Sequence, residues 1–98
     1  MEYPKWVNEP GLCPEEATRR RITFILKRAA LRVDPRGGIT HLSEAAGLER
    51  SYLHRFMEHH RLSDRAARLL SNVMTQEEIE AVQREVALLH NPAGASDE

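Results

Sequence analysis

The sequence contains little cysteine, few aromatic residues and no long hydrophobic run. Its one cysteine, Cys13, cannot form a disulfide within the chain, which excludes an internally stapled secreted scaffold. Five aromatic residues offer little for stacking against single-stranded nucleic acid. No apolar stretch approaches the roughly 20 residues that cross a bilayer, and the first residues do not resemble a secretory signal. We therefore expect a cytoplasmic protein without membrane association.

The chain is also too short for more than one core. A chain of 98 residues buries roughly two-thirds of its unfolded surface, which is enough for a single modest domain. Hydrophobic residues make up 41% and charged residues 30%, a balance typical of soluble globular proteins and too apolar for a disordered chain. No run of alternating apolar residues predicts a strand. The expected fold class is all-α.

The net charge of −1 conceals an uneven distribution. Residues 19–68 carry twelve Arg or Lys residues against five Asp or Glu residues, an excess of +7, whereas both ends of the chain are acidic. A basic middle of this kind is typical of a module that binds a polyanion. The alternative is a solvated surface on which the positive charges cluster by chance.

Apolar residues spaced three and four apart predict about five helices. An irregular arm, residues 1–13, precedes a helix from Pro14 to about Asp34, where Pro35 and two glycines stop it. Three short helices follow, and a capping box at Thr75 and Glu78 opens the last one. The three short helices are expected over 39–46, from 49 or 50 to 59, and over 64–73. The last helix is expected over 76–90, and a disordered tail follows over 91–98.

The segment 38–56 has the pattern of a helix-turn-helix. That motif needs a small residue where the helices cross, a turn residue that tolerates positive φ, and apolar residues on the inner face of the second helix. The small residue is Ser43 and the turn residue Gly47, and the apolar positions are Leu48, Leu53 and Phe56. An ordinary corner between two packed helices is the alternative interpretation.

Residues 42–53 resemble the helix-turn-helix motif of the Cro and phage-repressor-like family, which includes small antitoxin-type regulators. The resemblance covers roughly residues 15–74, because 62–70 is similar to the helix that follows the motif in that family. Two positions depart from its pattern: Ser43 stands where alanine is usual, and Glu49 replaces a capping serine. The resemblance implies a lambda-repressor-like bundle over 14–74 that binds double-stranded operator DNA, generally as a homodimer, and represses transcription.

Candidate DNA contacts lie at the start and on the outer face of the second helix of the motif, residues 50–59. Arginine can pair with guanine in the major groove, and serine or histidine can bond a base edge. The candidate base-reading residues are Arg50, Ser51, His54 and Arg55, and the candidate backbone contacts are Thr40, His41, Tyr52 and Arg61. For each, a solvated or packed side chain is the alternative. Arg61, Arg65 and Arg68 could instead pair with the acidic last helix.

The last helix, 76–90, carries an apolar stripe of Ile79, Val82, Val86 and Leu89. Its spacing suits helix-helix packing, and we predict that it forms a homodimer interface. The alternative is that the stripe closes the core of the single chain. Acidic residues are expected on the outer face of this helix, away from DNA: Glu77, Glu78, Glu80 and Glu85.

The histidines and Cys13 do not indicate an enzyme. His59 and His60 point in different directions on a helix, and His54 and His59 are five residues apart, so neither pair suits a metal. We expect no catalysis, no metal and no cofactor. The expected function is DNA binding at the nucleoid, and the alternative is a helical module that binds a protein partner through its acidic last helix.

Overall fold

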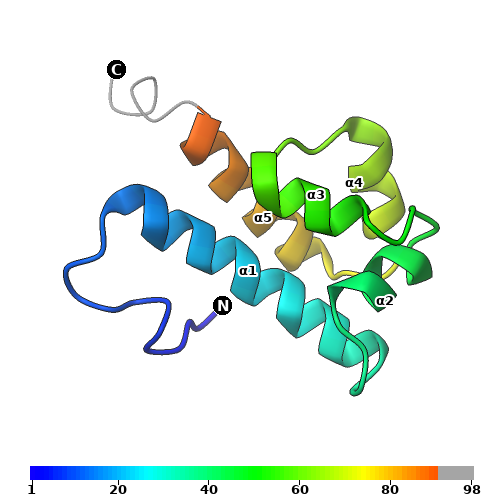
Figure 1. The fold of residues 1–98 in the computed structure, drawn as a ribbon, viewed down its shortest axis with the longest axis horizontal. Helices are drawn as coiled ribbons and strands as arrows, with labels where there is room; N and C mark the ends of the chain where they lie inside the picture. The colour runs from blue at the N-terminus through cyan, green and yellow to red at the C-terminus, as the bar shows by residue number, and fades with distance from the viewer. Residues whose placement is uncertain (91–98) are drawn as a thin grey trace.

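The computed structural model describes residues 1–90, and within that range the chain is all-helical. This confirms the predicted fold class and the number of helices. The predicted disordered tail, 91–98, lies outside the described residues. The five helices are α1 (Pro14–Val33), α2 (Ile39–Ala45), α3 (Tyr52–His59), α4 (Asp64–Leu70) and α5 (Gln76–His90) (Figure 1).

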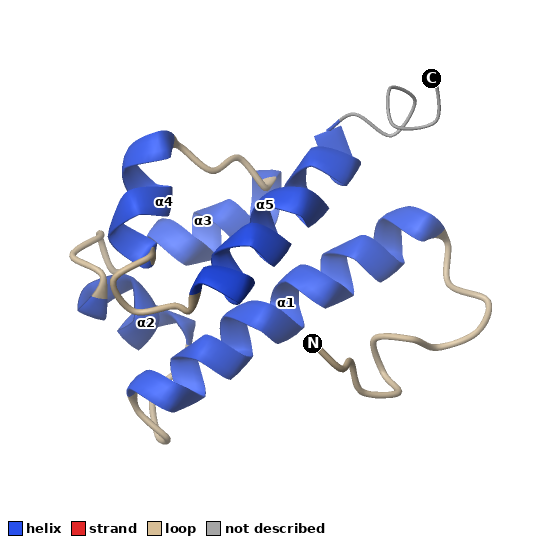
Figure 2. Cartoon of the chain, turned by 180° about the vertical axis from the view of Figure 1, so that it is seen from behind, coloured by secondary structure: helices blue, strands red, loops and turns tan. Residues whose placement is uncertain are grey.

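The two longest helices, α1 and α5, lie side by side and form the base of the bundle (Figure 2). The short helix α2 packs near the carboxyl end of α1, and α3 packs against α2. The core between these helices includes Ile25 of α1, Leu42 of α2 and Phe56 of α3, each at most 1% exposed. Burying an aliphatic or aromatic side chain contributes about 1.5–3 kcal/mol, so this shared core fixes how α2 and α3 sit on α1.

The bounds of α1, α2 and α5 agree with the sequence to within a residue, but two other helices are shorter than predicted. The third helix begins at Tyr52 rather than 49 or 50, because a turn places the Tyr52 N–H 3.0 Å from the Glu49 carbonyl. The fourth helix ends at Leu70 rather than 73. There the Ser71 hydroxyl donates to the Arg68 carbonyl at 2.6 Å, and Ser71–Val73 continue as turns.

The predicted capping box at Thr75 and Glu78 is present. The Thr75 N–H donates to Glu78 Oε1 at 3.0 Å, and the Glu78 N–H donates to Thr75 Oγ1 at 3.1 Å. Ser63 likewise accepts from the Ala66 N–H at 3.1 Å, as expected for the cap of α4. These local signals fix where α4 and α5 begin.

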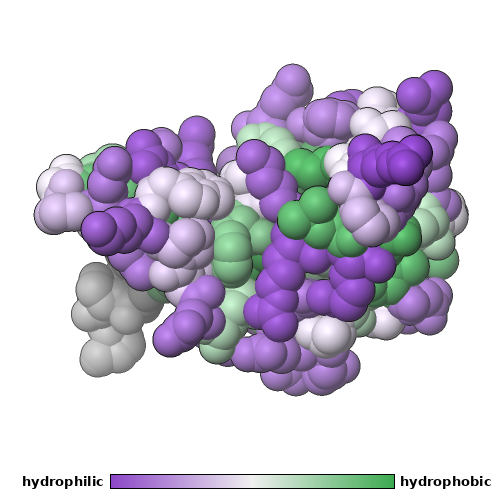
Figure 3. Space-filling model, turned by 90° about the horizontal axis from the view of Figure 1, so that it is seen from below, coloured by the Kyte–Doolittle hydropathy of each residue, from purple (hydrophilic) through white to green (hydrophobic). Residues whose placement is uncertain are grey.

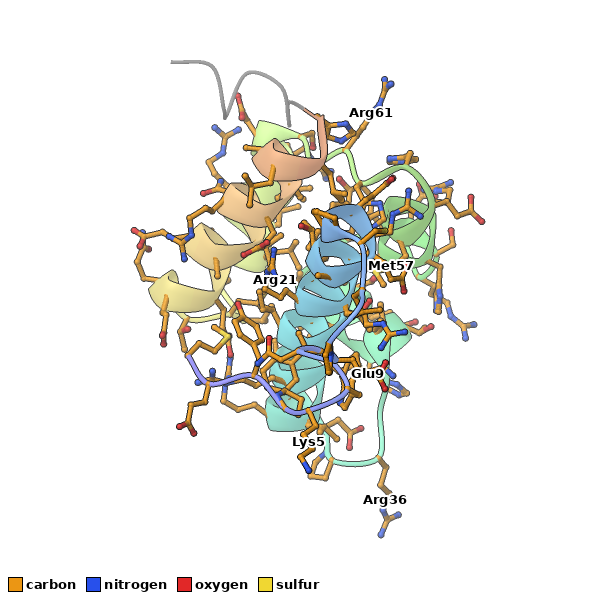
Figure 4. The ribbon with its side chains drawn as sticks, turned by 90° about the vertical axis from the view of Figure 1, so that its left-hand side faces the viewer. Lys5, Glu9, Arg21, Arg36, Met57 and Arg61 are labelled. Carbon is orange, nitrogen blue, oxygen red and sulfur yellow. The ribbon has the colours of Figure 1, made fainter. Side chains whose placement is uncertain are left out.

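The prediction that Glu78 and Glu85 lie on the outer face of α5 was wrong. Glu78 is 0% and Glu85 7% exposed, and both face α1. Arg21 donates to Glu85 at 2.8 Å, and its side chain points from α1 toward α5 in Figure 4. Glu78 pairs with Arg28 at 3.2 Å and accepts two hydrogen bonds from Arg32. The positive side of α1 therefore attracts two acids of α5 inward.

The apolar stripe of α5 packs mainly within the single chain. Ile79 and Val82 are 6% and 2% exposed in the core, which is the alternative that the sequence left open. Their burial leaves no surface for the interface that we predicted through them. Val86 and Leu89, the other two predicted interface residues, are partly buried against the same core.

The arm of residues 1–13 runs along α1 without forming a helix. Val7 is fully buried, and Tyr3 and Trp6 place their rings edge-on to Phe24, with centroids 5.5 and 6.3 Å away. The amino group of Met1 reaches Glu77 of α5 at 3.2 Å. The arm is thus tied to both long helices.

None of the five helices combines the length and the apolar character that a membrane span requires.

Candidate nucleic-acid interface

The turn between α2 and α3 has the geometry that the sequence predicted. Gly47 has φ +86°, a left-handed conformation that glycine adopts without steric cost. Its N–H donates to the Glu44 carbonyl at 3.0 Å, and the Leu48 N–H donates to the Ser43 carbonyl at 2.9 Å. This pair of bonds is the Schellman motif, which ends α2 and turns the chain toward α3. Leu48 then enters the core at 8% exposed.

Ser43 joins the two helices directly. Its side chain is fully buried where α2 crosses α3, and Oγ accepts from the Leu53 N–H at 3.3 Å while donating to the Ile39 carbonyl at 3.3 Å. The Leu53 N–H lies in the first turn of α3, where no carbonyl of the same helix can reach it. The sequence indicated only that this residue must be small. The hydroxyl also serves as a cap for α3.

Replacing Ser43 with alanine should lower the free energy of unfolding by about 1–2 kcal/mol, because a buried N–H loses its acceptor. Equilibrium urea denaturation measures the change. Ser51→Ala, which removes an exposed hydroxyl that makes no cap bond, is the control and should stay within about 0.5 kcal/mol of the parent. An unchanged stability in Ser43→Ala would show that the Leu53 N–H needs no partner.

The candidate base-reading residues lie together on one exposed face. Arg50, Ser51, His54 and Arg55 are all exposed, while Leu53 and Phe56 on the opposite face of α3 are 0% and 1% exposed. The amphipathic pattern thus placed the outward side of the helix correctly. Whether these residues bind DNA stays a prediction. Arg50 and Ser51 lie in the turn that leads into α3, and His54 and Arg55 lie in the first half of the helix.

Two of these residues are paired with acids of the same surface. Arg50 lies 3.4 Å from Glu44, and Arg55 lies 3.5 Å from Glu49. All four side chains are 46–78% exposed, and exposed ion pairs contribute only about 0–1 kcal/mol. The arginines can therefore exchange these partners for others at little cost. Neither pair was predicted from the sequence.

The structure brings together a predicted backbone contact and a predicted base contact. Thr40 Oγ1 and His54 Nε2 are 3.0 Å apart, so the first turn of α2 holds the imidazole of α3. The neighbouring His41 is exposed and packs over Gly37, where an added Cβ would lie 2.6 Å from the His41 ring. Both histidines therefore already have a local contact in the free protein, His54 with Thr40 and His41 with Gly37.

The remaining backbone candidates differ in their exposure. Tyr52 is half-buried against the core. Arg61 is exposed on the loop between α3 and α4 and extends away from the body of the molecule, as does Arg36 before α2 (Figure 4). Among residues 1–90, no carboxylate lies within 4.0 Å of Arg61, Arg65 or Arg68. These three cations do not pair with α5, which was the alternative for them.

The basic middle of the chain does not form one positive surface. The five arginines of α1 all pair with carboxylates of α1, the arm or α5. The pairs made by Arg20 with Glu16 and Glu9 raise the pKa of this guanidinium, although burial opposes the change. Residues 38–71 contain five arginines and four carboxylates, so this segment has only a small positive excess. The free positive charge near α3 is therefore local, at the α3–α4 loop and α4.

No cluster of three or more His, Cys, Asp or Glu side chains in residues 1–90 is arranged to hold a metal ion. A surface pocket of about 480 Å³ lies between the start of α1 and the end of α5 and is lined by residues such as Ala17, Thr18 and Leu88. This pocket does not include the outer face of α3.

Comparison of the sequence with models of protein families finds no match. Comparisons with curated proteins and with solved structures likewise find none. The geometry of α2, α3 and α4 is therefore the basis on which a function can be argued.

Proposed function

We propose that this chain binds double-stranded DNA in a sequence-specific manner and regulates transcription as a repressor of phage or prokaryotic type. The observation that carries the proposal is the surface formed by the start of α3 and the turn before it. Arg50, Ser51, His54 and Arg55 are exposed there, and the turn at Gly47 holds α3 against α2. The major groove, about 12 Å wide, admits a helix presented in this way. The helix-turn-helix resemblance of residues 42–53 supports the same function.

The residues around α3 divide into two roles. Arg50 and Arg55 release their exposed acidic partners and pair with guanine, while Ser51 and His54 bond neighbouring base edges. Thr40, His41 and Tyr52 lie on the flanks of this face and contact the phosphate backbone. Arg61, together with Arg65 and Arg68, adds unpaired positive charge that positions the protein on the duplex. Glu44 and Glu49 lie close to the same phosphates and limit the affinity for unrelated sequences.

A second candidate function is a protein-binding module. The pairing of all five α1 arginines reduces the charge available for DNA, and four large apolar side chains remain at least 37% exposed: Trp6, Leu31, Val33 and Leu88. On the face seen in Figure 3, however, apolar side chains are divided by polar ones. The DNA proposal has the better-defined surface.

The salt dependence of duplex binding separates the two candidates. Phosphate contacts release counterions, so binding should weaken steeply between about 50 and 200 mM salt, with a slope of about −0.9 per phosphate neutralised. The probe is first a mixed-sequence duplex and then sequences selected from a random pool. A pseudo-palindrome among the selected sequences would show that two copies bind together. Binding that is absent or independent of salt would contradict the proposal.

Replacing Arg55 with alanine should cost about 1–3 kcal/mol on the selected sequence, confined to one base position. Titrations against duplexes that differ at single positions measure this loss. Arg84→Ala on α5 is the matched control, because Arg84 is exposed on a helix outside the proposed interface and its loss should leave binding unchanged. Equal losses on every sequence would instead make Arg55 a phosphate contact.

A further inference from the structure

His60 ends α3 in a conformation that no other non-glycine residue of 1–90 adopts. Its φ is +54° and its ψ +43°, in the left-handed region, and its N–H donates to the Phe56 carbonyl at 2.6 Å. The side chain is only 4% exposed and meets the Phe56 ring edge-on, with centroids 5.5 Å apart. The packing of the imidazole at the end of the helix offsets the strain of the left-handed backbone conformation.

The ring of His60 has one buried nitrogen without a partner. Among residues 1–90, Nε2 of His60 is the one buried side-chain nitrogen or oxygen that makes no hydrogen bond. Whichever nitrogen carries the proton in the neutral ring, the charged ring must have an N–H at Nε2, and no acceptor is present for it. A charged imidazole is therefore poorly accommodated at this position.

The groups around His60 come from three helices. The side chains of Arg19 and Glu15 face it from α1, His90 from α5, and Glu58 and His59 from α3 itself. Burial lowers the pKa of His60, the charge of Arg19 lowers it further, and His90 and His59 act in the same direction, while Glu15 opposes them. The His60 carbonyl also accepts a hydrogen bond from the His90 ring. One residue thus connects the carboxyl ends of α3 and α5 next to the first turns of α1.

We propose that His60 is an acid-sensitive latch that holds the carboxyl end of α3 against α1 and α5. While the imidazole is neutral, it stays packed on Phe56 and its carbonyl keeps the bond from His90. On protonation the ring leaves the core for water, the left-handed cap is lost, and the end of α3 separates from α5. The latch is a property of the fold and stands independently of DNA binding.

The sign of the pH dependence follows from the neutral form being the native one. Because the unfolded chain binds a proton at the ordinary histidine pKa of 6.5 and native His60 resists it, the unfolded state holds more protons below that pH. The stabilisation is complete above pH 6.5 and is lost as the pH falls through the lowered pKa of the native residue. The carboxyl end of α3 should open before α2 does.

The test begins with an NMR titration of the histidine rings in the intact chain. The His60 ring, assigned through its own backbone, should titrate below the range of a histidine in an unstructured peptide. Over the same pH interval, amide protection at residues 56–60 should fall by about tenfold or more relative to α2. An ordinary titration of His60, or equal loss of protection in α2 and α3, would overturn the latch.

A variant adds a second measurement. His60→Asn keeps a side chain that tolerates the left-handed conformation and removes the titrating ring. Urea denaturation at about pH 7.5 and about pH 5.5, on either side of the ordinary pKa, should show a smaller loss of stability in this variant than in the parent. His41→Asn, at an exposed position, should keep the parental pH dependence. If His60→Asn also keeps it, the latch lies elsewhere and the proposal fails.

Discussion

Replacing Gly47 with valine is expected to lower the free energy of unfolding by about 3 kcal/mol, the upper end of the cost of a strained backbone position. The φ of +86° is open to glycine but strongly unfavourable for a β-branched residue. A loss of this size is a large fraction of the roughly 5–15 kcal/mol that stabilises a small domain. Guanidinium denaturation followed by circular dichroism measures it.

Two further variants separate the backbone effect from crowding. A Cβ at Gly47 would meet no atom within 4 Å, so the cost arises from the left-handed conformation and not from a clash. Gly47→Asn should therefore lose much less stability than Gly47→Val, because asparagine tolerates that conformation. Gly11→Val places the same residue at φ +89°, again with no atom within 4 Å of the added Cβ, so it should also lose stability without a clash. A Gly47→Val protein as stable as its parent would show that the α2–α3 turn does not depend on this glycine.

The features of the fold that could be predicted from the sequence are those encoded within a few residues. Gly47, Ser63 and the pair Thr75 and Glu78 each act on backbone groups at most four positions away, so their roles follow from local spacing. The start of α3 was misplaced because Glu49 and Tyr52 close a turn before the helix, and Ser51 makes no side-chain cap. The acceptor for this helix comes instead from Ser43, ten residues earlier. A contact at that separation depends on how two helices cross.

The orientation of α5 shows a second limit. Periodicity identifies the faces of a helix but not which of them a neighbouring helix will cover. The bond between Arg21 and Glu85 joins residues 64 positions apart, and that between Arg32 and Glu78 joins residues 46 apart. Charge counted along the chain therefore overstated the positive surface. Arg19 and Arg20 pair with acids that precede the basic segment, and the other three arginines of α1 pair with Glu78 and Glu85 of α5.

At the candidate interface, the sequence predicted which side of α3 faces outward but not what its side chains touch. Apolar Leu53 and Phe56 determine the buried side, and His54 and Arg55 on the other side are exposed. The partners Thr40 and Glu44 belong to α2, and they reach His54 and Arg50 only after the turn at Gly47 has set the angle between the helices. The contacts that the candidate DNA-binding residues make in the free protein are thus determined by the tertiary structure.

The second large effect is expected at Glu78, which joins the start of α5 to the carboxyl half of α1. Replacing it with alanine should lower the free energy of unfolding by about 3 kcal/mol, since the capping box and both arginine contacts are lost together. The value lies at the lower end for a broken buried ion pair, because Arg28 and Arg32 are 39% and 43% exposed and can return to water. Glu80→Ala, exposed on the same helix, should change stability by less than about 0.5 kcal/mol.

Glutamine at position 78 tests the charge apart from the cap. Burial raises the pKa of Glu78, but the hydrogen bonds from Arg32 and the Thr75 N–H, with the charges of Arg32 and Arg28, outweigh it and hold the pKa below its usual 4.5. Its ionised form is therefore the native one, so its stabilisation is complete above pH 4.5 and is lost as the pH falls through the lowered value. Glu78→Gln keeps an acceptor for the Thr75 N–H and should be less destabilised at neutral pH than Glu78→Ala. Below pH 4.5 its stability should fall less steeply than that of the parent, as measured by urea denaturation. Equal slopes would show that the carboxylate is not held by the arginines of α1.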